Sequence, residues 1–431
     1  MQISKNIFLF CNQINQNKKV PKILRIINRF NLGGPTYNAA YLTKYISSDF
    51  ETILVGGVKE EAEGSSEYIV RNMGIEPVVI PEMQRSLNPS YDLKAYRKIS
   101  KIIKKFKPDI VHTHASKAGT VGRLAAIRNK VPIIVHTFHG HVFHSYFGSS
   151  KTNFFINIEQ GLANQCSKII AISDKQKEEL SEIYKIAPPE KFEVIPLGFD
   201  LQRFREDISE RRKNFRDKYF IGDDEITIGL IGRLAPVKNH ELFLRAIKIA
   251  SQKTDKKIRA FVIGDGELMN NLTGLCKKIN LDYTKAFNGS AQKATVTFTS
   301  WIKAIETAYP GLDIIAMTSL NEGTPVSLIE AQAANKAIIS TNVGGIENIV
   351  IGGKTATLTK NNDLDDFSAK LIELINNDNL RKHYEQNSWE YVKNKFHYTR
   401  LVSDTEELYY NLLKKVEKKP QLFLSFLHAK K

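Results

Sequence analysis

Short apolar runs alternate along the chain with longer segments whose apolar residues recur at helical spacing. Such short runs are typical of buried strands, and the helical spacing indicates amphipathic helices. In the first half the predicted strands are Ile23–Asn28, Thr52–Val55, Pro77–Ile80, Ile110–His114, Ile133–Thr137 and a strand with its turn at Lys168–Ser173. The helices predicted between them are Thr36–Ile46, Glu63–Met73, Leu93–Phe106 and one that begins near Thr120. This alternation predicts an α/β fold built on parallel, doubly wound sheets.

The second half repeats the alternation. A strand begins at Thr227, and further strands are predicted at Arg259–Gly266, Leu312–Met317 and Ala337–Thr341. Helices are predicted at His240–Ala250, Asp365–Asn376 and Asn379–Lys418. With 431 residues, the chain is expected to form two domains.

The stretch from Leu312 to Gly345 has the clearest pattern for a site. The strand at its start leads into a loop, after which Thr324 suits the N-cap of a helix and Pro325 suits its first turn. We expect this helix to run to Ala334, with Asn335 as its stop. A strand, loop and helix in this order present backbone N–H groups and a positive helix dipole, which favour a bound phosphate.

Two carboxylates frame that loop and helix. Glu322 lies in the loop, and Glu330 lies about two turns further along the helix. Because a carboxylate accepts two hydrogen bonds, it suits the vicinal hydroxyls of a sugar or a ribose. The alternative is a solvated loop glutamate and a surface helix glutamate with no shared function.

The segment Glu322-GTPVSLI-Glu330, followed by Ala331 and by Asn342-Val-Gly-Gly345, resembles the Glu-x7-Glu signature of retaining glycosyltransferases of family 4. The resemblance implies the GT-B fold, with two Rossmann-like domains facing a cleft. It also implies that Glu322 is a catalytic-site residue that positions the donor sugar and that Glu330 holds the ribose. The donor phosphates are then expected at the helix start, at Gly323, Thr324, Pro325 and Val326.

Further segments carry the same resemblance in the same order. The loop after Thr227 resembles the family's Gly-Arg-Leu…Lys segment, which implies that Arg233 and Lys238 neutralise the diphosphate. A surface salt-bridge role for these two cations is the alternative. The glycine turn at Gly33 and Gly34 is expected to approach the donor phosphates and the acceptor; an ordinary tight turn is the alternative.

A second glycine turn, at Gly264 and Gly266, is expected to border the nucleobase. It is not a dinucleotide fingerprint, because Met269 stands where a third glycine would be needed. The sequence departs from the family pattern nearby, with an insertion at 282–294 and with Ser300 where a glycine is usual. These departures leave the base and the donor sugar open, although UDP is the expected nucleotide.

Histidines gather at the ends of the predicted strands of the first half: His112, His114, His136, His139, His141 and His144. A metal site is the alternative, but no carboxylate joins them locally and no His-Glu-x-x-His motif is present, so no metal is predicted. A family histidine at the matching place faces the transferred sugar, which implies a catalytic role for His139. His114 and Lys117 are expected on the acceptor side, whereas packed or surface roles are expected for His136 and His144.

The expected domain organisation is an N-terminal extension at 1–21, an acceptor-side domain at 22–200 and a donor-binding domain at 206–390. The linker is placed near 198–205. The helix at 391–418 is expected to cross back to the first domain, and a basic and apolar tail occupies 419–431.

The formal net charge of +16 changes this picture in one respect, because it permits an anionic partner. No nucleic-acid-binding motif accompanies the charge, so association with an anionic inner-membrane surface is the expected use, with lysine-rich composition as the alternative. No apolar run is long enough to span a bilayer, no secretory signal is evident, and the three cysteines have no metal spacing. A cytoplasmic protein, with or without peripheral membrane association, is expected.

Together these features predict a retaining glycosyltransferase of hexosyl or N-acetylhexosaminyl type. It would require no cofactor, and it would move a sugar from a nucleoside-diphosphate sugar as co-substrate to a glycan or lipid-linked glycan in surface polysaccharide, lipopolysaccharide or capsule synthesis. A sugar-nucleotide 2-epimerase of the same fold and a catalytically inactive sugar-binding subunit are the alternatives.

Overall fold

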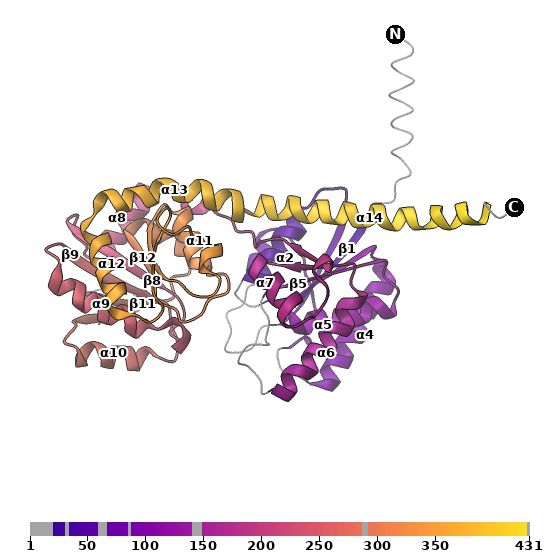
Figure 1. Ribbon diagram of the computed structural model, residues 1–431, viewed down its shortest axis with the longest axis horizontal. Helices are drawn as coiled ribbons and strands as arrows, with labels where there is room; N and C mark the ends of the chain where they lie inside the picture. Colours follow the sequence, from indigo (N-terminus) through magenta and orange to yellow (C-terminus); the bar gives the residue numbers. More distant parts are fainter. Residues whose placement is uncertain are drawn as a thin grey trace, which may run out of the picture. The chain divides into compact units, whose positions relative to one another are not determined.

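The structure is a computed structural model that describes residues 20–30, 34–58, 67–84, 88–139, 149–286 and 292–428, with the side chains at 149–151 and 418–428 excepted. The chain divides into two compact units (Figure 1). The first comprises Met1–Phe199 and Tyr398–Lys431, and the second comprises Asp200–His397. Each unit is described separately.

The first unit contains a 7-stranded parallel sheet in the order β3-β2-β1-β4-β5-β6-β7. Its strands are β1 (Lys22–Arg29), β2 (Glu51–Gly57), β3 (Val78–Val79), β4 (Ile110–His114), β5 (Ile133–Phe138), β6 (Lys168–Ala171) and β7 (Phe192–Val194). Its helices are α2 (Gly34–Lys44), α3 (Glu67–Asn72), α4 (Pro89–Phe106), α5 (Ser116–Arg128), α6 (Ser149–Gln165), α7 (Asp174–Glu178), η1 (Glu179–Ile183), η2 (Pro189–Lys191) and α14 (Tyr398–His428).

Alternate residues of each strand face opposite sides of this sheet, and both sides are covered. Leu24 and Ile26 of β1 join the cluster beneath α4 and α5, which lie side by side in Figure 1. Ile23 joins the opposite cluster, which includes Leu408 and Tyr409 of α14. The first unit is therefore doubly wound, as the alternation of elements predicts.

The second unit repeats this design with a 7-stranded parallel sheet in the order β10-β11-β9-β8-β12-β13-β14. Its strands are β8 (Glu225–Ile231), β9 (Lys257–Ile263), β10 (Tyr283–Lys285), β11 (Val296–Ser300), β12 (Ile314–Met317), β13 (Ala337–Thr341) and β14 (Thr357–Thr359). Its helices are η3 (Gln202–Phe204), α8 (Ile208–Lys218), η4 (Pro236–Lys238), α9 (His240–Lys253), α10 (Met269–Lys278), η6 (Ile305–Thr307), η7 (Tyr309–Gly311), α11 (Val326–Ala333), η8 (Ile346–Asn348), α12 (Leu364–Asn376) and α13 (Asp378–Phe396).

Several helix bounds differ from the sequence-based ones. Helix α11 begins at Val326, with Pro325 rather than Thr324 at its N-cap and no side-chain capping bond, so the prediction of a Thr324 cap was wrong. Helix α5 begins at Ser116, ahead of the predicted Thr120. The segment predicted as one helix over Asn379–Lys418 is two helices, because His397 takes an extended conformation that ends α13. Asn335, the predicted stop, does adopt the left-handed conformation just after α11.

The turn after β13 fixes the loop that follows β12. The backbone N–H of Gly345 donates to the carbonyl of Glu322 at 2.8 Å. Gly344 has a φ of +55°, and a Cβ at this position would lie 2.0 Å from that same carbonyl oxygen. Only glycine allows both the left-handed turn and the close approach that holds Glu322 in place.

Replacing Gly344 by Ala is expected to lower the free energy of unfolding of the second unit by about 2 kcal/mol or more, because strain and a clash with the Glu322 carbonyl add together. Gly353→Ala is the matched control, since Gly353 also has a positive φ, +75°, but a Cβ there meets nothing within 4 Å. It should cost about 1 kcal/mol.

Both tryptophans of the chain, Trp301 and Trp389, belong to the second unit, so their fluorescence during urea unfolding reports this unit selectively. Equal destabilisation by Gly344→Ala and Gly353→Ala would contradict the proposed close approach.

Candidate functional site

Adjacent strands of the second unit bring Lys238 and Glu322 together. Strands β8 and β12 are parallel neighbours, so the loops that follow them meet at one edge of the sheet. Lys238 Nζ lies 2.5 Å from Glu322 Oε1, and the two side chains are 25% and 10% exposed. The Ser319 hydroxyl donates to the same carboxylate oxygen at 2.5 Å. A partly buried ion pair thus occupies the predicted phosphate and sugar position.

Hydrogen bonds between the two loops keep this pair in place. The backbone N–H of Leu320 donates to the carbonyl of Val237 at 2.8 Å, and the Thr318 hydroxyl donates to the carbonyl of Lys238 at 3.0 Å. The Thr341 hydroxyl of β13 donates to the carbonyl of Ser319 at 2.7 Å. The position of Lys238 relative to Glu322 is therefore set by the backbone as well as by charge.

Arg233, the second predicted phosphate ligand, lies in the same loop but has a different environment. Its side chain is 68% exposed and pairs with the half-exposed Glu267 at 3.1 Å. Exposed ion pairs contribute little to stability, so this guanidinium can exchange its partner for another anion at small cost. In contrast, Lys238 is already bonded to Glu322 and would have to share its ammonium protons with an incoming phosphate.

Glu330 lies in α11 in a largely buried position, with 14% of its side chain exposed. Burial raises the pKa of Glu330 from 4.5 to about 7, although Arg203, 3.9 Å away, and a hydrogen bond with Tyr309 oppose the shift. The Tyr309 hydroxyl lies 3.0 Å from Glu330 Oε2 and 2.9 Å from the carbonyl of Ser327. A hydroxyl carries one proton, so both contacts are hydrogen bonds at once only if Glu330 is protonated.

The start of α11 is the predicted phosphate position. Gly323 has open space around its Cα, and Thr324 is partly exposed. Pro325 has extended backbone angles, and Val326 is the first helical residue. The first N–H groups of a helix have no intrahelical acceptor, so this segment presents donors next to Glu322.

The turn that follows β9 packs tightly against the loop after β8. A Cβ at Gly264 would lie 1.9 Å from the carbonyl oxygen of Gly232, and one at Gly266 would lie 2.6 Å from that of Leu234. Ser300, where the family pattern has glycine, adopts a φ of +58°, and its hydroxyl donates to Asp265 at 3.2 Å. The left-handed backbone conformation at position 300 therefore explains why glycine suits this position.

In the first unit, three histidines form a connected group at the ends of β4 and β5. His112 contacts the Tyr409 hydroxyl at 2.6 Å and the Thr137 hydroxyl at 2.7 Å. Its ring stacks against that of His114, with centroids 4.2 Å apart. His114 Nδ1 lies 3.0 Å from Nε2 of His139.

All three imidazoles are neutral at physiological pH. Burial lowers the pKa of His139 from 6.5 to about 3. It holds the pKa values of His112 and His114 well below 6.5, and the positive charge of Arg25 acts in the same direction. His112 and His114 have no exposed surface, so His114 reaches a ligand in this structure only through His139.

The remaining predicted residues of this unit lie as follows. Gly34 is the first residue of α2, whereas Gly33 lies outside the described residues. Lys117 pairs with Asp92 at 2.7 Å in a mostly buried position. His136 packs so closely on α5 that a Cβ at Gly119 would lie 2.4 Å from its ring, which agrees with a packing role. His141 and His144 also lie outside the described residues.

Three residues of these sites were not predicted from the sequence. Ser319, Tyr309 and Arg203 contact Glu322 or Glu330, but none of them belongs to a recognisable motif. Ser319 was within reach of inference because it lies in the same loop as Glu322. Arg203 and Tyr309 are distant in the sequence from Glu330, so only the fold brings them to it.

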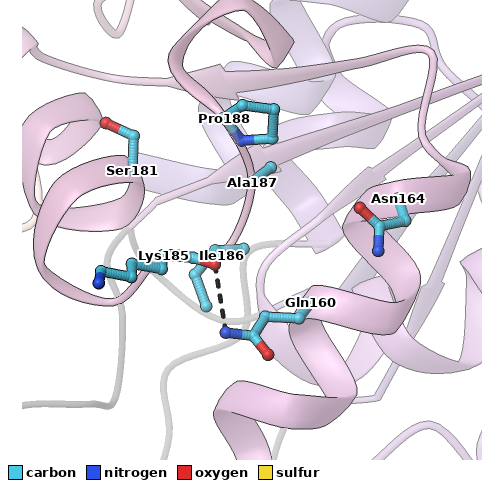
Figure 2. Close-up of a pocket in the computed structure, with 7 residues that line it drawn as sticks. All are labelled: Gln160, Asn164, Ser181, Lys185, Ile186, Ala187 and Pro188. Carbon is cyan, nitrogen blue, oxygen red and sulfur yellow. Dashed lines mark hydrogen bonds between the residues drawn. The ribbon is translucent and has the colours of Figure 1, made fainter.

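Two cavities among the described residues of the first unit are not lined by the predicted residues. One cavity of about 300 Å³ lies between α6 and the segment after η1 (Figure 2). Its side-chain polar groups are partly used within the chain, since Gln160 donates to the Lys185 carbonyl at 3.2 Å and Ser181 donates to the Lys177 carbonyl at 2.8 Å. We assign no role to this cavity.

No group of three or more His, Cys, Asp or Glu side chains that could hold a metal ion occurs among the described residues. Within the same part of the chain, no helix combines the length and the apolar character that a membrane crossing requires.

Comparisons with known proteins match almost the whole of this fold. Residues 211–390 match the family model described as glycosyl transferases group 1, and residues 39–203 match the one described as glycosyltransferase family 4. The chain is 30% identical over 341 residues to the Escherichia coli UDP-Gal:alpha-D-GlcNAc-diphosphoundecaprenol alpha-1,3-galactosyltransferase. That match covers 78% of this chain and 83% of the relative.

One further relative has a related sequence, and one solved structure has the same fold. The Staphylococcus aureus capsular polysaccharide biosynthesis glycosyltransferase CapM is 27% identical over 346 residues, covering 79% of this chain and 86% of CapM. The crystal structure of HepE from Anabaena in complex with UDP superposes with a TM-score of 0.72 at 18% identity, covering 90% of this chain and 100% of HepE. The latter shows that the two sheets form the GT-B fold.

Proposed function

We propose that this chain transfers a sugar from a UDP-sugar to a glycan or lipid-linked glycan acceptor with retention of anomeric configuration. The premise is that the chain belongs to the glycosyltransferases of group 1 and family 4. The observation that carries the proposal is the Lys238–Glu322 pair at the carboxyl ends of β8 and β12, with Glu330 further along α11. The E. coli relative is named for a UDP-sugar donor and a lipid-linked acceptor, and HepE is named with UDP bound.

Each group of the second unit has a distinct duty in this proposal. Lys238, Arg233 and the N–H groups at the start of α11 stabilise the diphosphate as negative charge develops on it. Glu322 positions the donor sugar, and Glu330 accepts hydrogen bonds from the ribose hydroxyls. The turn at Gly264 and Gly266 borders the base. In the first unit His139 contacts the transferred sugar, Gly34 approaches the donor phosphates and the acceptor, and Lys117 acts on the acceptor side.

The proposed chemistry is a front-face substitution, because no described residue of the second-unit site is positioned as an obvious covalent nucleophile. The bond between the anomeric carbon and the phosphate oxygen breaks, and the acceptor hydroxyl oxygen bonds to that carbon on the same face. The leaving phosphate oxygen takes the hydroxyl proton. The nearby cations offset the charge that accumulates on the leaving diphosphate.

Transfer assays separate this proposal from its two alternatives. With a UDP-sugar and a lipid-linked acceptor, we expect a glycosylated product that forms only when acceptor is added and that has the donor's anomeric configuration. Release of a free sugar product without acceptor would favour a sugar-nucleotide 2-epimerase. Tight UDP-sugar binding without turnover toward any acceptor of this class would favour an inactive sugar-binding subunit.

Replacing Glu322 and replacing Glu330 should affect different kinetic constants. Glu322 is near the reacting carbon, so Glu322→Gln should mainly lower kcat. Glu330 is remote from the reacting bond and binds substrate and transition state alike, so Glu330→Gln should mainly raise the KM for donor and weaken UDP binding. Losing one charge-assisted hydrogen bond corresponds to about 10-fold or more in UDP affinity. Intact UDP affinity in Glu330→Gln with weakened affinity in Glu322→Gln would reverse the assignment.

The pH dependence of UDP binding supplies the control for Glu330. Its pKa is raised to about 7, so it is ionised and able to accept two hydrogen bonds above that pH and is neutral below it. UDP affinity should therefore fall as the pH is lowered through about 7. Glu330→Gln should remove that part of the dependence and leave only the titration of the phosphate, as measured by calorimetry.

We further propose that the protein is cytoplasmic and meets an anionic membrane through the groove between α4 and α5. A cavity of about 400 Å³ there is lined by the cations Arg97, Lys101, Lys104 and Arg128, for which no ion pair is found among the described residues. Leu93 and Leu124, 48% and 47% exposed, precede Arg97 and Arg128 by four positions on their helices. Cations without an ion-pair partner among the described residues, next to exposed leucines, suit a phosphate-bearing headgroup with acyl chains.

Sedimentation with vesicles tests this surface. Binding should require acidic lipid and should weaken as salt rises, because exposed charges are screened beyond about 8–10 Å at such ionic strengths. Arg97→Glu with Lys101→Glu should abolish binding, whereas Lys277→Glu with Lys278→Glu, the same charge change on α10, should not. Equal loss of vesicle binding in both double variants would show that binding depends on net charge alone, which would contradict the proposed surface.

A further inference from the structure

His114 and His139 are joined by a hydrogen bond between two neutral imidazoles. Each neutral ring carries one N–H, so only one of the two nitrogens, His114 Nδ1 or His139 Nε2, donates across the 3.0 Å contact. The donor determines which nitrogen of each ring carries the proton. The bond therefore couples the protonation pattern of His139 to that of His114.

Burial selects between the two arrangements. His114 Nε2 is buried and has no partner among the described residues, and the His114 side chain has no exposed surface. Either arrangement leaves one buried N–H without an acceptor among the described residues, on His114 Nε2 or on His139 Nδ1. An N–H on the fully enclosed His114 has no access to a ligand, whereas one on the partly exposed His139 can meet a ligand oxygen. His114 should therefore keep its proton on Nδ1 and donate it to His139 Nε2.

This choice leaves the proton of His139 on Nδ1. That atom is also buried and unpartnered in the described structure, but His139 follows the end of β5 and is only partly buried as a residue. A buried N–H without an acceptor is a site for a ligand oxygen. His139 Nδ1–H would then donate to an oxygen of the transferred sugar.

The surroundings hold His114 in this orientation. Its ring stacks on His112, which is itself bonded to Tyr409 and Thr137. Burial lowers the pKa of His114 and keeps its ring neutral. The neighbouring His112 and His136, and Arg25, which is fully buried on β1, lower that pKa further. Ala115, the next residue, has φ +66° and ψ 163°, a conformation that non-glycine residues rarely adopt. Strain of this kind persists only where the surrounding structure imposes it.

We infer that His114 is a positioning residue that fixes the orientation and the Nδ1–H tautomer of His139, and that it does not contact the acceptor itself. This inference rests on the proposed role of His139 in sugar transfer. It replaces the acceptor-side role that the sequence predicts for His114.

Nuclear magnetic resonance of the full chain, labelled with 15N in the histidine rings, reads the tautomer without any assay of activity. The His139 signals are identified by their loss in His139→Gln. We expect a protonated Nδ1 and an unprotonated Nε2. A protonated Nε2 on His139 would overturn the inference.

Two amide substitutions at His114 form a matched pair. The amide of Asn occupies the place of Nδ1 and can still donate to His139, whereas the amide of Gln lies near the place of Nε2, which has no partner. His114→Asn should keep the tautomer and nearly normal kcat. His114→Gln should lose the tautomer and lower kcat about 10-fold, the factor of one hydrogen bond, with little change in the acceptor KM.

A double-mutant cycle separates the positioning role of His114 from the role of His139 in sugar transfer. If His114 acts through His139, the loss in His114→Gln should largely disappear in a His139→Gln background. Normal transfer by His139→Gln would refute the role of His139 itself. Impaired His139→Gln together with normal kcat and an unchanged tautomer in His114→Gln would refute the positioning role alone. If His114→Gln does not fold, the wild-type spectrum and that of His114→Asn still test the predicted tautomer of His139.

Discussion

The second unit depends on the ion pair between Lys238 and Glu322. Two parallel strands end side by side, and hydrogen bonds from Leu320, Thr318 and Ser319 hold their loops so that this lysine meets this carboxylate. The pair keeps a cation in a partly buried position without a ligand. In the proposed donor complex Lys238 would share its protons with a diphosphate, which would link donor binding and the placement of Glu322 through one ammonium group.

Burial shifts the pKa values of several candidate site residues toward the neutral form. It raises the pKa of Glu330 to about 7 and lowers that of His139 to about 3, so near pH 7 Glu330 is about half ionised and His139 is neutral. The hydrogen bonds around them therefore depend on where single protons lie. Tyr309 and His114 matter for this reason, since each supplies or directs one proton.

Most strands and the α/β class follow from the apolar runs, and two domains are expected from the chain length, whereas the order of the strands in each sheet was not predicted. The candidate site residues were predicted from resemblance, most directly where a motif was continuous, as in Glu322–Glu330 and Gly232–Lys238. Thr324 was mistaken for a cap because its residue type fits, whereas Pro325 is the N-cap and the helix starts at Val326. Contacts such as Arg203 with Glu330 and Tyr409 with His112 join distant segments, so no local pattern could reveal them. Ser300 shows the reverse case, in which a departure from the pattern has a visible backbone consequence.

A crystal structure of the full chain with UDP tests the central claim most directly. The account predicts a diphosphate oxygen within hydrogen-bonding distance of Lys238 Nζ, at about 2.7–3.2 Å. It also predicts ribose hydroxyls on Glu330 and a Glu322 carboxylate still bonded to Ser319. UDP bound away from the carboxyl ends of β8 and β12, with the Lys238–Glu322 pair undisturbed and Glu330 unliganded, would contradict it.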